Sequence, residues 1–218
     1  MALTFYAASG SPFAWKVWLA LEHKKLEYEL KLLSIAAGDL RKPEYAAINP
    51  RMKVPAIVVD GGFSLYESSA IVEYLEERHP HRPSLLPGDF QRRAVARRIA
   101  AECDAYLHPA SMRFFRQTAP KREGESEGDA KEIAAAKGEL VLELERIERV
   151  MTDGWLVDDP SVADFAAYPM LASVCRLGER HPQHSMNAAL GPLTRTWMER
   201  VEGLPYFATC YPPHWKAA

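Results

Sequence analysis

The chain has 218 residues, of which 48% are hydrophobic and 26% charged, and its formal net charge is −2 at pH 7. This length and apolar content exclude a disordered chain and give room for one or two domains with a sizeable core. The nearly balanced charge gives no drive toward nucleic acid or anionic membranes, and no apolar run reaches the ~18 residues of a membrane span.

The N-terminal third of the chain is predicted to alternate strands and helices. Residues 3–6 form a short apolar run typical of a buried strand. The next apolar residues have the i, i+3, i+4, i+7 spacing of a helix that faces a core: Ala14, Val17, Trp18 and Leu21. Residues 26–32 then alternate apolar and polar side chains, which predicts a strand and, with the elements before it, a βαβ unit. A short helix is expected over residues 41–48.

A hairpin and a helix follow. The strands of the hairpin, residues 56–59 and 63–66, flank the turn Asp60-Gly61-Gly62. Pro55 stands just before the first of these strands, where a missing N–H is tolerated. A helix over residues 68–78 completes the order β-α-β-α-β-β-α.

The segment from His79 to Asp89 carries three prolines and one glycine, which predicts a linker. Beyond it the apolar residues keep helical spacing and no strand pattern is convincing. Residues 121–129 are polar and broken by glycine, which predicts a mobile loop between two long helices. We therefore expect three parts: an α/β domain over residues 1–80, a linker over 81–88 and an all-helical domain over 89–218.

The three cysteines, Cys103, Cys175 and Cys210, lie far apart and form no CxxC pair. This favours a reducing compartment and no disulfide framework. The first residues, MALTFYAASG, lack the basic and long apolar segments of a signal peptide. We therefore expect a cytoplasmic protein.

Three motifs stand out by their order and spacing. SPFAWKV, residues 11–17, lies at the first strand-to-helix turn, and NPRMKVPAI is followed by ESSAI within residues 49–71. SVADFAAYP, residues 161–169, contains the S-x-x-D pattern of a capping box. Together they resemble the cytosolic glutathione S-transferase family over nearly the whole chain. The resemblance implies a thioredoxin-like N-terminal domain, an all-helical C-terminal domain, glutathione as co-substrate, and no metal.

The resemblance also implies how glutathione binds. The Val54–Pro55 bond is cis in the family, which turns the backbone of Val54 outward to pair with an extended peptide. The γ-glutamyl carboxylate then suits the N-terminus of the helix that begins at Ser68, where the serine hydroxyl adds a hydrogen bond. Glu67 can accept from the γ-glutamyl ammonium.

The glycine end of glutathione needs a cation. Arg41 and Lys53 stand where family members often place basic or amide groups. The position before Arg41, often histidine in the family, is Leu40 in this chain.

Ser11 matches the residue that activates the glutathione thiol in serine-type members of the family. It precedes Pro12, which makes it the predicted N-cap of the first helix. A hydroxyl donor and a helix N-terminus both favour a thiolate over a thiol. Two alternatives stay open: Ser11 is a helix cap only, or the activating hydroxyl belongs to Ser9 or Tyr6.

The electrophile is expected between the two domains, against apolar side chains. Candidates for this wall are Phe13, Tyr106, Met112, Phe114 and Phe115. Arg113 and Arg116 hint at an acidic substrate, and Asp104 has the pattern of an exposed helix charge. The aromatic segment YPPHW, residues 211–215, is expected to pack on the fold.

A homodimer is a further implication of the resemblance. We expect its interface at the helices that follow Ser68 and Asp89. Four arginines would there face glutamates of the partner: Arg92, Arg93, Arg97 and Arg98 against Glu73, Glu76 and Glu77.

The resulting hypothesis is a glutathione S-transferase that activates the thiolate for attack on a small hydrophobic electrophile. The alternatives are a glutathione-dependent isomerase or dehalogenase on the same scaffold, or a non-catalytic glutathione- or ligand-binding protein. A thiol–disulfide reductase is disfavoured because residues 9–14 contain no cysteine. Neither nucleic acid nor a membrane is expected as a partner.

Overall fold

The computed structural model describes residues 2–119 and 128–215 of the chain, so most of the loop expected over residues 121–129 lies outside the described residues. The N-terminal part contains a four-stranded sheet in the order β2-β1-β3-β4. β1 runs parallel to β2 and antiparallel to β3, and β4 pairs antiparallel with β3. The strands are β1 (Leu3–Ala7), β2 (Glu29–Leu32), β3 (Ala56–Val59) and β4 (Phe63–Tyr66).

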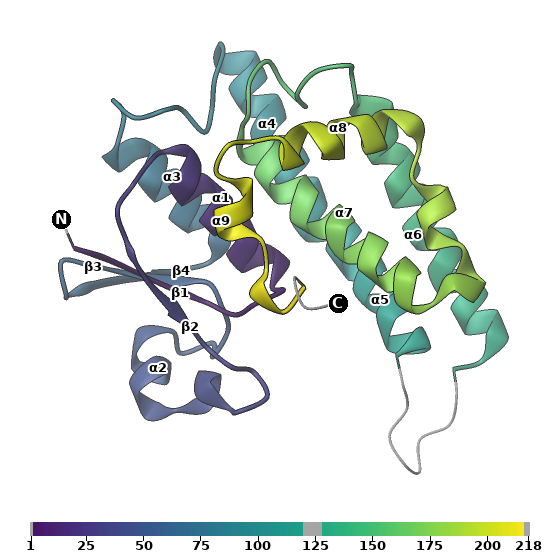
Figure 1. The fold of residues 1–218 in the computed structure, drawn as a ribbon, viewed down its shortest axis with the longest axis horizontal. Coiled ribbons are helices and arrows are strands. Elements are labelled where there is room, and N and C mark those ends of the chain that lie inside the picture. The colour runs from purple at the N-terminus through teal and green to yellow at the C-terminus, as the bar shows by residue number, and fades with distance from the viewer. Residues whose placement is uncertain (1, 120–127, 216–218) are drawn as a thin grey trace.

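Helices lie on both faces of this sheet (Figure 1). α1 (Pro12–His23) and α3 (Ser68–Arg78) cover one face, and η1 (Asp39–Arg41) and α2 (Pro43–Ile48) lie on the other. α1 is buried on all sides from Ala14 to Leu21 because it lies between the sheet and helix α7 of the second part. The order β-α-β-α-β-β-α with this mixed sheet is the thioredoxin-like fold.

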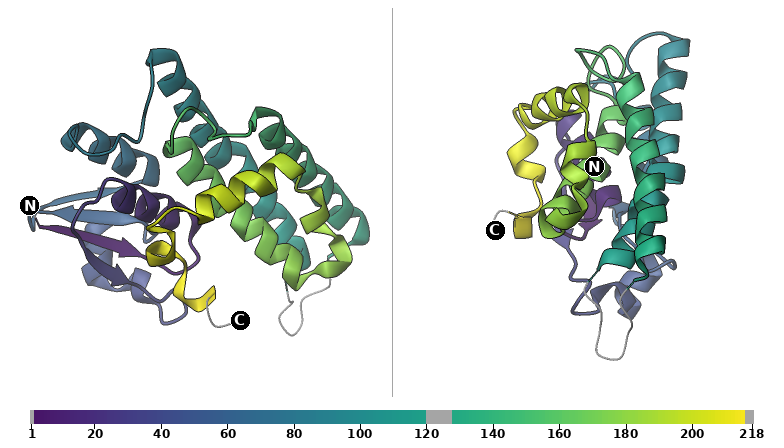
Figure 2. Two further views of the ribbon diagram at one scale, coloured as in Figure 1. Left: turned by 45° about the horizontal axis from the view of Figure 1, so that its top comes forward. Right: turned by 90° about the vertical axis from the view of Figure 1, so that its right-hand side faces the viewer.

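The rest of the described chain is helical, and its long helices run side by side (Figure 2). Among the described residues, no helix is both long and apolar enough to span a membrane. The helices are α4 (Phe90–Glu102), the π-helical turn η2 (Cys103–Leu107), α5 (His108–Thr118), α6 (Ala130–Val150), α7 (Val162–Arg180), η3 (Pro182–His184), η4 (Met186–Ala189), α8 (Pro192–Glu202), α9 (Phe207–Cys210) and η5 (Pro213–Trp215).

α7 is the central helix of this part, and its start confirms the predicted capping box. The Ser161 side chain accepts from the backbone of the first turn, and the Asp164 side chain accepts from the Ser161 N–H at 2.9 Å. Asp164 is fully buried and also accepts from the Trp197 indole at 2.8 Å. Burial raises the pKa of this carboxyl. The box therefore ties the start of α7 to α8.

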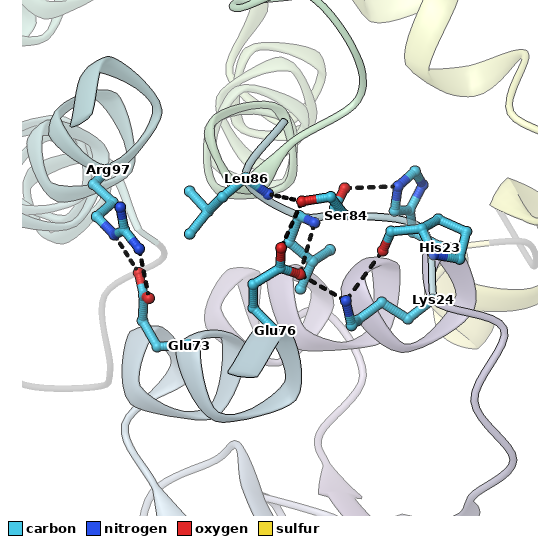
Figure 3. A network of polar contacts seen from close by, with 9 residues as sticks. His23, Lys24, Glu73, Glu76, Ser84, Leu86 and Arg97 are labelled. Carbon is cyan, nitrogen blue, oxygen red and sulfur yellow. Dashed lines mark hydrogen bonds and ion pairs between the residues drawn. The ribbon is translucent and has the colours of Figure 1, made fainter. Parts of the chain in front are cut away.

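The linker is fastened to the thioredoxin-like part by a network of charges (Figure 3). The buried Lys24 ammonium lies 2.6 Å from the Glu76 carboxylate and donates to the Pro83 carbonyl at 3.1 Å. Glu76 also accepts from the Ser84 hydroxyl at 2.5 Å and from the Leu85 N–H at 2.9 Å. α1, α3 and the linker thus meet at one carboxylate.

Ion pairs within the chain correct the predicted role of the four arginines at the start of the helical part. Arg97 forms two hydrogen bonds with Glu73 of its own chain, at 2.8 and 3.0 Å, across the junction of α3 and α4. Arg92 pairs with Asp158. The chain itself therefore supplies the partners of Glu73, Glu76 and Arg97, so these side chains do not need a partner subunit.

Most predicted elements are confirmed, and the differences have local causes. The strands of the hairpin and the helix over residues 68–78 have the predicted bounds. The strand predicted over residues 26–32 is shortened to Glu29–Leu32, and the helix expected from residue 41 begins at Pro43 after a separate 3-10 turn.

Tyr106, a candidate for the apolar wall of the electrophile site, has a side chain that is 58% exposed. The π-helical turn Cys103–Leu107 adds a residue to the turn and rotates the side chains that follow, so Leu107 takes the buried position.

Candidate active site

Two openings flank the first turn of α1. The first, called here the α3 groove, has a volume of about 300 Å³. It joins the first turn of α1, the start of β3, the start of α3 and the π-helical turn. Its lining residues are Phe13, Asn49, Lys53, Val54, Pro55, Glu67, Ser68, Ser69 and Asp104.

The backbone at Val54 borders the α3 groove and is open to a ligand. The Val54–Pro55 bond is cis, as expected. Within the described part of the chain, neither the N–H nor the C=O of Val54 forms a hydrogen bond. The preceding carbonyl, of Lys53, accepts from the Tyr45 hydroxyl at 2.5 Å and the Asn49 amide at 2.6 Å. These bonds hold the segment while the polar groups of Val54 stay unpaired.

The start of α3 forms the opposite wall. Its N-cap, Glu67, has φ +70° and provides no side-chain cap. Ser68 is only 5% exposed, and its hydroxyl has no hydrogen-bond partner among the described residues. An uncapped N-terminus with an unpaired hydroxyl suits a carboxylate. A carboxylate group of a small ligand therefore fits this wall.

A buried ion pair supports the same wall and was missed in the sequence. The Lys16 side chain is 0% exposed, and its ammonium lies 2.6 Å from Asp104. Ser69 bridges the pair: its hydroxyl accepts from Lys16 at 3.3 Å and donates to Asp104 at 3.0 Å. Asp104 is thus held within its own chain and is not a plain exposed charge. The signal in the sequence was a single lysine inside the apolar run AWKVWLAL.

The second opening, the α7 cavity, has a volume of about 250 Å³ and lies between the first turn, α5, α7 and the C-terminal segment. Its apolar wall includes Met112, Phe115, Met170, Val174 and Leu177. Its polar lining residues are Ser9, His108, Ser111, Ser173, Arg176, Arg180 and His214.

Arg176 gives the α7 cavity its charge. Its buried Nε has no hydrogen-bond partner, and its guanidinium carbon lies 4.8 Å from the centre of the Trp215 ring. Arg180, one turn further along α7, lines the same cavity. Buried guanidinium groups are normally paired, so this cavity suits an anion.

The predicted wall residues divide between the two openings. Met112 and Phe115 line the α7 cavity, whereas Phe13 lines the α3 groove and packs edge-on against His108, with ring centres 4.7 Å apart. Phe114 is fully buried in the core and lines neither opening, and Tyr106 faces a separate groove between α4 and α6. The Phe13–His108 pair therefore stands between the α3 groove and the α7 cavity.

The remaining predicted site residues are placed as follows. Lys53, Glu67 and Ser68 lie together in the α3 groove, whereas Arg41 is exposed and lines neither opening. Arg113, expected as a hint of an acidic substrate, is paired with Glu132 and Glu139. Arg176 and Arg180 line the α7 cavity instead, and neither was among the residues expected from the sequence.

The three candidate hydroxyls differ in their surroundings. Ser11 is the N-cap of α1, where its Oγ accepts from the Ala14 N–H at 3.3 Å, and it lines neither opening. Tyr6 packs against Tyr45, with ring centres 5.7 Å apart. Ser9 lines the α7 cavity, and its Oγ lies 2.5 Å from the Nδ1 of His214.

The segment Tyr211–Trp215 packs on the fold, as expected. The rings of Tyr211 and Trp215 both contact Trp15 of α1, with centres 5.7 and 5.4 Å apart. In the described ranges, no group of three or more His, Cys, Asp or Glu side chains could hold a metal ion.

A thioredoxin-like part with a groove at α3 is joined to a helical part with an adjoining cavity. Models of the glutathione S-transferase N-terminal and C-terminal domains match residues 10–78 and 100–205. The chain belongs to the glutathione S-transferase family and is an enzyme of that family.

Several relatives and solved structures support this membership. The chain is 36% identical over 184 residues to a maleylacetoacetate isomerase of Pseudomonas aeruginosa, covering 80% of this chain and 81% of the relative. It is 30% identical over 175 residues to a maleylacetoacetate isomerase of Mus musculus, covering 78% and 77%. A glutathione S-transferase of the Antarctic clam Laternula elliptica superposes with a TM-score of 0.83 at 27% identity, covering 100% and 95%. One of Methylobacterium radiotolerans, solved in complex with glutathione sulfonate, gives 0.76 at 30% identity, covering 97% and 95%.

Proposed function

We propose that this enzyme binds glutathione in the α3 groove and acts on a small, unsaturated, anionic substrate in the α7 cavity. The unpaired, partly buried guanidinium of Arg176 carries the proposal. A neutral electrophile leaves that cation without a counter-charge, whereas a carboxylate pairs with it in the two-pronged manner that guanidinium groups favour.

The fit of glutathione rests on three features of the α3 groove. The γ-glutamyl carboxylate suits the uncapped start of α3 and the unpaired hydroxyl of Ser68. Glu67 can accept from the γ-glutamyl ammonium. The unpaired N–H and C=O of Val54 match the backbone of an extended peptide.

Lys53 lines the α3 groove and is our candidate for the glycine carboxylate of glutathione. Arg41 is the second candidate, and because it lines neither opening it needs to extend toward the ligand.

Ser11 is our candidate for thiol activation. A thiol with a pKa of about 8.5 is only about 3% ionised at pH 7. Ser11 stands at the positive end of α1, and its oxygen accepts from Ala14, so its own proton can be donated to a sulfur. The hydroxyl and the helix N-terminus would together favour the thiolate.

The relatives named above as maleylacetoacetate isomerases support an isomerase over other reactions. Maleylacetoacetate has two carboxylates, ketone groups and a cis double bond. Bound glutathione supplies a thiolate that adds to such a double bond and leaves after rotation, so that it is regenerated. The protein's part is to hold a carboxylate at Arg176 and Arg180 and to place the double bond beside the first turn of α1.

The second candidate function is conjugation of glutathione to a small hydrophobic electrophile. It is favoured by the apolar wall of the α7 cavity, which includes Met112, Phe115 and Leu177. In this reaction glutathione is consumed, whereas in the isomerisation it is not.

The test compares two substrates with and without glutathione. We expect purified protein to convert maleylacetoacetate from cis to trans only when glutathione is present, with no loss of glutathione. Conjugation of neutral 1-chloro-2,4-dinitrobenzene without any isomerisation would instead establish the second candidate.

The role of Arg176 is tested in the same assay. Loss of a charge-assisted hydrogen bond costs about 1.5–3 kcal/mol, so Arg176→Gln should lower kcat/KM for maleylacetoacetate roughly 10- to 100-fold. Rates with the neutral electrophile should stay the same. Arg113→Gln is the matched control, because Arg113 is paired with glutamates and lines neither opening.

A further inference from the structure

The C-terminal segment returns to the first turn of the chain, where it closes one side of the α7 cavity. Figure 1 shows it passing beside α1 toward the end of the sheet. His214 Nδ1 lies 2.5 Å from Ser9 Oγ, and the Trp215 indole nitrogen lies 3.0 Å from His214 Nε2. The approach is close at Gly10, because a Cβ there would lie 2.7 Å from the His214 ring.

The contact with Trp215 fixes which nitrogen of His214 carries the proton. An indole N–H is only a donor, so Nε2 must accept and has no proton. A neutral ring then carries its proton on Nδ1 and donates it to Ser9 Oγ. Burial and the charges of Arg176 and Arg180 lower the pKa of His214, which keeps the ring neutral.

Ser9 therefore differs from the other serines of the α7 cavity. Its oxygen accepts from His214, and among the described residues its own proton has no acceptor. The hydroxyl of Ser111 donates to the His108 carbonyl at 2.8 Å, and that of Ser173 donates to the Pro169 carbonyl at 2.7 Å. Only Ser9, of these three serines, can donate a proton into the cavity.

We propose that Ser9 donates a hydrogen bond to the carbonyl oxygen of the substrate held by Arg176, and that His214 and Trp215 are positioning residues for this hydroxyl. The inference rests on the proposed function, because it assumes an anionic carbonyl substrate in the α7 cavity. A carbonyl conjugated to a double bond gains negative charge when a nucleophile adds. A donor already oriented toward it stabilises that charge without reorganisation.

Packing of the C-terminal segment is the competing explanation for these contacts. Trp215 also packs on Trp15 and under Arg176, and those contacts alone could hold the segment in place. The two explanations differ for Trp215→Phe, which keeps an aromatic ring but removes the indole N–H. In that variant Nε2 is no longer required to accept, so His214 can take the other tautomer and accept the Ser9 proton.

The first measurement needs no substrate. In the wild type at neutral pH, ¹⁵N chemical shifts of His214 should show a protonated Nδ1 and an unprotonated Nε2. In Trp215→Phe, the population with a protonated Nε2 should rise. A wild-type ring protonated on Nε2 would overturn the proposal, whatever the enzyme turns over.

The second measurement is kinetic. Ser9→Ala should lower kcat/KM for maleylacetoacetate roughly 10- to 100-fold while the Kd of glutathione stays the same. Trp215→Phe and His214→Ala should also lower kcat/KM. His214→Asn should keep most of the wild-type kcat/KM, because its amide can donate from a position close to that of Nδ1. Ser64→Ala is the matched control, because Ser64 is exposed on β4 and lines neither opening.

The outcomes separate this inference from the proposed function. If the wild type turns over no unsaturated keto acid, the proposed function fails. The ¹⁵N measurement then still decides which nitrogen of His214 carries the proton. If the wild type is active and Ser9→Ala has the same kcat/KM as Ser64→Ala, the proposed role of Ser9 is wrong while the proposed function stands.

Discussion

The buried ammonium of Lys16 and the carboxylate of Asp104 lie 2.6 Å apart and join α1 to the π-helical turn at the edge of the α3 groove. Through Ser69 the same pair holds the first turn of α3. The wall proposed to bind the γ-glutamyl group is thus supported from the thioredoxin-like part and from the helical part together. Substitutions at this pair should affect both stability and ligand binding.

Lys16→Met is expected to destabilise the protein by about 2–3 kcal/mol, because it leaves the Asp104 carboxylate without its cation. It should also weaken glutathione binding, since Ser69 loses one of its two partners. Urea unfolding and calorimetric titration measure the two effects. Lys31→Met is the matched control: its pair with Glu29 is exposed, so the substitution should change stability little. Equal effects of the two variants would contradict this role of Lys16.

A second prediction concerns pH and Glu76. Burial raises the pKa of this carboxyl, but the hydrogen bonds from Leu85, Lys24 and Ser84 outweigh it, so the pKa lies below its ordinary value of 4.5. A carboxyl with a lowered pKa contributes stability that is present above pH 4.5 and is lost as the pH falls through the lowered value.

Glu76→Gln should therefore cost about 2–3 kcal/mol at pH 7, where the buried Lys24 loses its counter-charge. The difference in unfolding free energy between wild type and variant should shrink as the pH falls below 4.5. Urea unfolding from pH 7 to pH 3 measures it. Glu77→Gln, an exposed position on the same helix, is the control. If the difference in unfolding free energy stays constant with pH, the charge of Glu76 does not contribute to stability.

The hairpin and α3 could be predicted from the sequence because local residue patterns mark where each element begins and ends. Pro55 precedes β3, the Asp60-Gly61-Gly62 turn separates the strands, and the polar residues from Glu67 onward begin the helix. No tertiary contact is needed to place these boundaries. The residues expected in the α3 groove came from the family resemblance, and most of them belong to this one stretch of chain.

The features that could not be predicted from the sequence depend on contacts between residues far apart in the chain. The exposure of Tyr106 could not be predicted, because a π-helical turn leaves no mark in the apolar spacing. The apolar spacing predicted one core-facing stripe on the first helix, but α1 is buried on all sides. Asp104, the partner of the buried Lys16, lies 88 residues away. His214 meets Ser9 across 205 residues. Only the aromatic character of the C-terminal segment indicated that it packs on the fold.

A third prediction concerns assembly. We expect a homodimer through α3 and α4, although the arginines and glutamates first assigned to the interface are paired within one chain. Phe90 at the start of α4 is 88% exposed and Val95 is also exposed, which leaves apolar surface on that helix. Light scattering at micromolar concentration should give twice the mass of the chain, and Phe90→Asp should raise the dissociation constant. A monomer under these conditions contradicts the expectation.

The last prediction concerns Ser11, whose two proposed roles give different pH profiles. As the N-cap of α1, it should cost about 1 kcal/mol of stability when replaced by alanine, whatever its part in catalysis. If its hydroxyl also stabilises the glutathione thiolate, Ser11→Ala should raise the pKa of the bound thiol toward about 8.5 and lower kcat with little change in the Kd of glutathione.

The loss of activity in Ser11→Ala should then be largest near pH 6.5 and shrink above pH 9, where the thiol ionises unaided. Because nucleophilicity falls with pKa, the loss stays modest, roughly a few-fold at neutral pH. The ultraviolet absorbance of the bound thiolate and turnover from pH 6 to 9.5 measure both effects. Ser9→Ala should leave the thiol pKa unchanged, since its hydroxyl faces the α7 cavity. A profile that is unchanged in Ser11→Ala but shifted in Ser9→Ala or Tyr6→Phe would assign thiol activation to that other hydroxyl.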